Sequence, residues 1–83
     1  MEEKIGEVDH FFNHISVAAI VLTGSLSVGE TIHIIGATTD FTQPINSMEI
    51  DCQKIDKATA GQSVGIRTVK RVRKGDTVYK IIF

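Results

Sequence analysis

Apolar and polar residues alternate along much of this chain, as they do in a β-strand that buries one face. In residues 31–35 and 62–66 the apolar residues fall on every second position, which places their side chains on one side of a pleated strand. Val, Ile, Thr and Phe are frequent in such segments, and Gly, Asn and Pro separate them at short intervals. Because no window has the period of an amphipathic helix, the pattern predicts an all-β chain.

The Gly, Asn and Pro residues between these segments set the bounds of the predicted strands. They cover residues 5–12, 15–25, 31–35, 41–51, 62–68 and 77–82, with a short piece near 54–58. A length of 83 residues corresponds to one small domain, so residues 1–83 are expected to form a single unit. Closure of short strands into a barrel removes the sheet edges that promote aggregation. We therefore expect a small six- or seven-stranded antiparallel β-barrel.

One predicted strand is apolar on both faces. If its inward row is Ala18, Ile20 and Leu22, then an outward row of Val17, Ala19 and Val21 needs a cover. Two covers are possible: another part of the same chain, of which the terminal residues 81–83 are one example, or a second subunit. The outward row is therefore a candidate interface.

A short motif occurs twice, each time where a predicted strand opens. Val28-Gly29-Glu30-Thr31-Ile32 is echoed by Lys74-Gly75-Asp76-Thr77-Val78. Glycine supplies positive φ in a turn, and the acid can accept hydrogen bonds from backbone N–H groups as the strand begins. The motif predicts two similar turns and no catalytic chemistry.

Composition is ordinary for a globular protein, with 42% hydrophobic and 23% charged residues. Cys52 is the single cysteine, so no intrachain disulfide can form, which favours a cytoplasmic location. Residues 1–4 lack the features of a signal peptide, and no apolar run reaches the ~18 residues of a membrane span.

Charge is distributed unevenly along the chain. Residues 1–66 contain three lysines and nine acids, a net charge of −6, whereas residues 67–83 contain six basic residues and one acid, a net charge of +5. The basic stretch is a candidate RNA-binding surface, because cations can follow a phosphate backbone; a solvated loop and a protein-facing patch are the alternatives. Its candidate residues are Arg67, Lys70, Arg71, Arg73 and Lys74.

Residue types that could support catalysis or cofactor binding are present without a supporting pattern. The candidate metal ligands are Asp9, His10, His14, His33 and Cys52, but strands joined by turns do not align them, so ordinary histidines are expected. A neighbouring carboxylate disfavours the reactive thiolate of Cys52. No nucleophile elbow, Walker sequence or glycine-rich dinucleotide loop occurs. We expect no enzymatic activity, no metal or other cofactor and no bound nucleotide.

Five segments between Ile5 and Ile81 carry a resemblance to a known family: Leu22-Thr23-Gly24-Ser25-Leu26, Leu26 to Ile34, Ile45-Asn46-Ser47-Met48, Ala58 to Ile66 and Arg73 to Val78. In this order they resemble domain II of the translational GTPases, the β-barrel that follows the G domain in elongation factor Tu. The resemblance implies a barrel of the elongation factor domain II type. In that family a Glu and an Arg beside a Met hold the acceptor end of tRNA, but the matching positions here are Ser47 and Ile50, and Ser25 replaces a further Arg.

A second resemblance is to the C-terminal barrel of collagenase-like peptidases. It is carried by Phe41 to Met48, Lys57-Ala58 and Lys74-Gly75-Asp76, and it implies an accessory module without peptidase chemistry. The leading hypothesis is a translation elongation factor-like module that contacts RNA or a ribosome-associated partner through the basic stretch. The alternative is an accessory barrel that binds a protein partner, or a second copy of itself, through the outward row.

Overall fold

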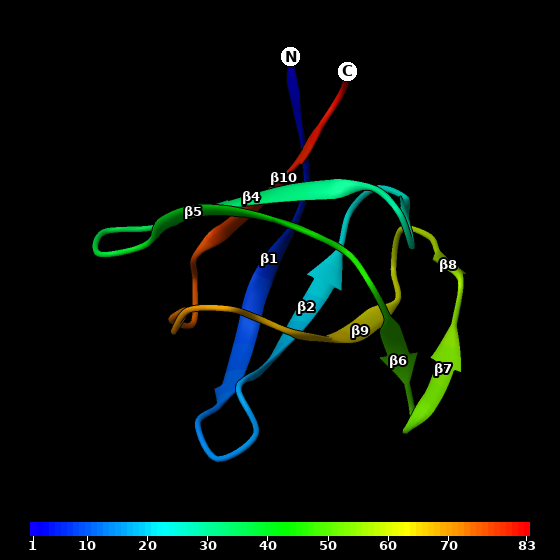
Figure 1. The fold of residues 1–83 in the computed structure, drawn as a ribbon, viewed down its shortest axis with the longest axis horizontal. Helices are drawn as coiled ribbons and strands as arrows, with labels where there is room; N and C mark the ends of the chain where they lie inside the picture. The colour runs from blue at the N-terminus through cyan, green and yellow to red at the C-terminus, as the bar shows by residue number, and fades with distance from the viewer.

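The structure is a computed structural model that describes residues 1–83 and contains strands but no helices (Figure 1). This confirms the expected all-β class. No segment forms a helix with the length and apolar character that a membrane crossing would need. The strands are β1 (Glu2–Phe12), β2 (Val17–Leu22), β3 (Leu26–Ser27), β4 (Thr31–Ile35), β5 (Asp40–Pro44), β6 (Met48–Ile50), β7 (Gln53–Ile55), β8 (Lys57–Ala58), β9 (Ser63–Arg67) and β10 (Thr77–Ile81).

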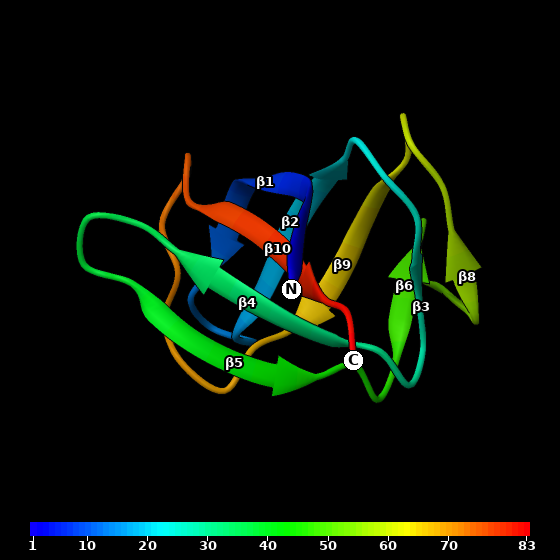
Figure 2. The same ribbon diagram turned by 90° about the horizontal axis from the view of Figure 1, so that it is seen from above.

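Eight of these strands form one antiparallel sheet in the order β5-β4-β10-β1-β2-β9-β6-β7, and β3 pairs with β8. The sheet curves round, as Figure 2 shows from above, and brings β5 towards the segment that follows β9. A small barrel of antiparallel strands results, as the sequence predicts.

A side-chain amide joins the two sides of the barrel where no backbone ladder does. Gln43 of β5 is only 6% exposed. Its Nε2 donates to the carbonyl oxygen of Arg67 at 3.0 Å, and the N–H of Val69 donates to its Oε1 at 2.9 Å. The amide of Gln43 therefore does what a peptide group does in a strand pair, because it offers one donor and one acceptor in one plane.

The interior holds a single cluster of sixteen buried apolar residues. Ala18, Ile20 and Leu22 of β2 belong to it, with at most 1% of each residue exposed. The predicted inward row of this strand is therefore confirmed.

Several strand boundaries differ from the prediction, and ten short strands replace the expected six or seven. Residues 31–35 match β4, but residues 41–51 divide into β5 and β6. The division follows Pro44, which has no N–H for a ladder; the N–H of Ile45 instead donates to the Glu30 carbonyl oxygen at 2.8 Å. The short strand β3 was not predicted.

The two echoed turns have the predicted chemistry. Gly29 and Gly75 have φ values of 98° and 94°. Glu30 Oε1 accepts from the N–H of Ser27 at 2.7 Å, and Asp76 Oδ2 accepts from the N–H of Arg73 at 2.9 Å. In each turn the acid therefore holds the backbone three residues upstream and fixes where the next strand begins.

Candidate functional site

A groove of about 690 Å³ runs over the outer face of β2 and β9, beside the β6–β7 hairpin. Its apolar surface comes from Phe12, Ile15, Val17 and Ala19, and its charged residues are Glu49, Asp51, Lys54 and Arg67. An apolar floor with a polar rim is the arrangement of many protein-binding surfaces.

The candidate interface of β2 lies partly in this groove. Val17 and Ala19 line it and are half-buried, whereas Val21 lies outside it and is 41% exposed. The terminal residues do not cover the row: Phe83 is 99% exposed, and Ile82 bonds to the Met1 carbonyl oxygen at the opposite end of β1. Residues 81–83 are therefore not the cover of this row.

The β6–β7 hairpin forms a wall of the groove that the sequence did not reveal. Asp51 and Cys52 form its two-residue turn, with φ values of 52° and 65°. Two successive positive φ values are typical of the hairpin turns that match strand twist, but the Asn-Gly or Asp-Gly that usually signals them is absent. Gly65 of β9 pairs with Glu49 of β6 and places this wall beside Val17.

The candidate RNA-binding residues lie together on an exposed loop. Arg67 ends β9, and the other four lie in the loop that joins β9 to β10. All five are exposed.

The candidate metal ligands lie apart from one another. The structure contains no group of three or more His, Cys, Asp or Glu side chains in an arrangement that could hold a metal ion. The ring of His10 packs edge-on against that of Phe12, with centroids 4.4 Å apart.

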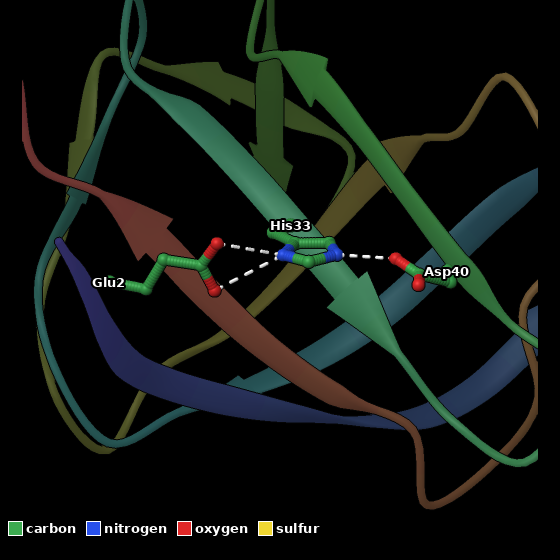
Figure 3. A network of polar contacts seen from close by, with 3 residues as sticks. All are labelled: Glu2, His33 and Asp40. Atoms are coloured by element: carbon green, nitrogen blue, oxygen red, sulfur yellow. Dashed lines mark hydrogen bonds and ion pairs between the residues drawn. The ribbon is translucent and has the colours of Figure 1, made fainter.

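His33 instead joins two carboxylates on the outer face of the barrel, as Figure 3 shows. Its Nδ1 lies 2.9 Å from Glu2 Oε2, and its Nε2 lies 2.5 Å from Asp40 Oδ1. The network links β1, β4 and β5. Both nitrogens can donate at once only in the protonated ring, and the hydrogen bonds to Asp40 and Glu2 raise the pKa of His33 above 6.5.

This network predicts a pH dependence of stability. Because the pKa of His33 is higher in the folded state, its stabilising effect is complete below about pH 6.5 and is lost as the pH rises through the folded value. Both carboxylates are exposed, so we expect the network to contribute only roughly 1 kcal/mol to the free energy of unfolding. Urea unfolding should show a larger difference between the native protein and His33→Gln at pH 5.5 than at pH 8.5. The control is the same substitution, His14→Gln, at an exposed histidine. A stability difference for His33→Gln that does not change with pH would contradict the prediction.

Comparison with known proteins gives relatives of one kind. No family model matches the chain. It is 40% identical over 77 residues to an uncharacterized protease of Methanocaldococcus jannaschii, covering 92% of this chain and 19% of that protein. It is 31% identical over 78 residues to a collagenase of Porphyromonas gingivalis, covering 92% of this chain and 22% of that protein. The chain thus spans about a fifth of the length of the curated relatives it matches.

Solved structures agree on the fold. The C-terminal domain of a Geobacillus thermoleovorans protein assigned to the U32 peptidases superposes with a TM-score of 0.89 at 19% identity, covering 96% of this chain and 93% of that one. Its selenomethionine variant gives a TM-score of 0.87. The chain resembles the C-terminal barrels of collagenase-like peptidases.

The predicted translation elongation factor-like, RNA-binding function is wrong. The sequence relatives are a protease and collagenases, and they support the alternative hypothesis of an accessory barrel. One of the segments that resemble domain II, Arg73 to Val78, forms a turn that Asp76 holds through the N–H of Arg73. Turns of this kind are part of the barrel fold, and a shared fold does not imply a shared function.

Proposed function

We propose that this chain is a non-catalytic accessory barrel that docks onto the catalytic part of a collagenase-like peptidase. The observation that carries the proposal is the coverage of the comparisons. The match takes in 92% of this chain but only 19% to 22% of each sequence relative. Each relative therefore has a counterpart of this barrel next to a much larger part of its own chain.

The groove over β2 and β9 supports docking at that surface. Val17 and Ala19 form apolar surface that residues 81–83 do not cover. Phe12 and Ile15 also line the groove, and they are 46% and 54% exposed. Contiguous apolar surface with charged residues around it is typical of protein interfaces. The peptidase would bury these side chains, and the charges of Glu49 and Arg67 would set the orientation.

A chimera tests the proposal directly. In the Porphyromonas gingivalis collagenase, the 78 aligned residues would be replaced by this chain, and hydrolysis of a collagen-derived peptide would be measured beside deletion of the same residues. We expect the deletion to lower kcat/KM and the chimera to restore it. Full activity after deletion would contradict an accessory role, and hydrolysis by the isolated chain would contradict a non-catalytic one.

Within the chimera, Val17→Lys should lower the restored activity by about tenfold. The reason is that an unpaired charge buried in an interface weakens the binding free energy by on the order of 1.4 kcal/mol or more. The matched control is Val69→Lys, since Val69 is 72% exposed and lies outside the groove. Thermal unfolding of the isolated Val17→Lys chain checks that the barrel still folds. Light scattering on the isolated chain, of mass 9.1 kDa, tests whether a second copy of the chain occupies the groove instead. A doubled mass that returns to the monomer value in Val17→Lys would assign the groove to a second copy.

A further inference from the structure

The loop between β9 and β10 concentrates positively charged side chains. Its exposed cations form no ion pair within 4.0 Å, whereas Lys4, Lys80 and His33 all do. Like charges placed together on a surface repel one another unless an anion lies between them. We refer to the cations of this surface as the basic patch; they are Arg67, Lys70, Arg71, Arg73 and Lys74.

The backbone that carries the patch is fixed in place. Val72, in the middle of the loop, is 1% exposed and belongs to the core. Thr68 Oγ1 donates to the Lys70 carbonyl oxygen at 2.7 Å, and the N–H of Gly75 donates to the Val8 carbonyl oxygen at 2.8 Å. A ligand would therefore meet cations whose backbone is already ordered, so little conformational entropy would be lost on binding.

Part of the patch lines a small pocket against the end of β1. The pocket has a volume of about 220 Å³, and its polar lining comes from His10, Asn13, Arg71, Arg73 and Lys74. Arg73 Nε donates to Thr38 Oγ1 at 2.9 Å, which orients this guanidinium. Guanidinium and ammonium groups are donors without acceptors, so the pocket is suited to an anion. Its volume is below the range of about 300–1,000 Å³ common for drug-sized ligands and fits one or two acidic side chains.

We propose that this pocket binds an acidic segment of a partner protein, whose Asp or Glu carboxylates pair with Arg71, Arg73 and Lys74. Arginine pairs with carboxylates through two parallel hydrogen bonds. A protein segment suits the pocket better than RNA, because single-stranded RNA is held by exposed aromatic rings on which bases stack. Of the two rings that line the pocket, that of Phe11 packs against the core and that of His10 packs edge-on against Phe12.

The inference goes beyond the proposed function and can fail separately from it. The pocket and the groove share no lining residue. Loss of peptidase docking through Val17 would therefore leave acidic-peptide binding intact, and loss of the pocket would leave docking through the groove intact.

Fluorescence anisotropy with a labelled short peptide rich in Glu and Asp tests the pocket. We expect the peptide to bind the whole chain and binding to weaken between about 50 and 200 mM salt, as screening of exposed charges requires. Arg71→Gln and Lys74→Gln should each weaken binding about fivefold, the effect of one exposed charge pair of about 1 kcal/mol. Neither side chain has a hydrogen-bond or ion-pair partner within the chain, and circular dichroism verifies that the fold is retained.

Matched controls exclude a general charge effect. Lys54→Gln and Lys57→Gln remove exposed cations outside the pocket and should leave the affinity unchanged. The same peptide with Gln and Asn in place of Glu and Asp should not bind. Three results would overturn the proposal: no binding of the acidic peptide, equal weakening by Lys57→Gln and Arg71→Gln, or tighter binding of an oligouridine of the same charge.

Discussion

Replacement of Gly36 by alanine should lower the free energy of unfolding by about 3 kcal/mol, since overpacking of a tight site and loss of a buried hydrogen bond combine. Gly36 follows β4, and an added Cβ would overlap the carboxylate of Asp76. Asp76 is 5% exposed, and it holds the N–H of Arg73. The carboxylate would have to move and give up this bond, and the turn before β10 would lose the hydrogen bond that holds it.

Urea unfolding followed by circular dichroism measures this effect. Gly65→Ala is the matched control, because an added Cβ there would lie 3.4 Å from Val17 Cγ1, an ordinary contact distance. A double-mutant cycle with Asp76→Ala isolates the cause: once the carboxylate is absent, Gly36→Ala should cost much less. An equal cost in both backgrounds would show that the clash with Asp76 is not responsible.

Replacement of Gln43 by alanine should lower the free energy of unfolding by about 2–3 kcal/mol, because two backbone groups lose their partner together. The N–H of Val69 and the carbonyl oxygen of Arg67 both bond to this side chain, and they lie 26 and 24 residues away from it in the sequence, respectively. Truncation would therefore leave the closure of the barrel without its hydrogen bonds.

The control for Gln43 is a glutamine with local bonds only. Gln62 Oε1 accepts from the N–H of Thr59 at 2.8 Å, three residues away, and Gln62 is exposed. Gln62→Ala should cost less than about 1 kcal/mol, since water can replace its bonds. Equal costs for the two substitutions, measured by urea unfolding, would mean that Gln43 does not close the barrel.

Features encoded by neighbouring residues were predictable from the sequence. The alternation in residues 31–35 gives β4 its bounds, and the apolar rows of β2 give its inward face. The Gly-acid-Thr motif gives both turns, because the acid bonds to a backbone group only three residues away. Each of these inferences needs only the period of a strand or the chemistry of a turn.

Features that join distant segments could not be predicted in this way. Glu2 and His33 are 31 residues apart, and only the placement of β1 and β4 on either side of β10 brings them together. The groove depends in the same way on where the β6–β7 hairpin packs. One signal was present for Gln43: it lies two residues after Phe41 and two before Ile45, both of them apolar. A polar residue at a core position needs hydrogen-bond partners.

Closure through one amide also affects how exposed one edge of the sheet is to other copies of this chain. If the Gln43 side chain rotates away, β5 becomes a free edge of the eight-stranded sheet, and free edges recruit strands from other molecules. The edge strand begins with Asp40 and ends with Pro44, a charge and a residue without an N–H, both of which oppose such recruitment. The same five residues that complete the barrel thus also resist its polymerisation.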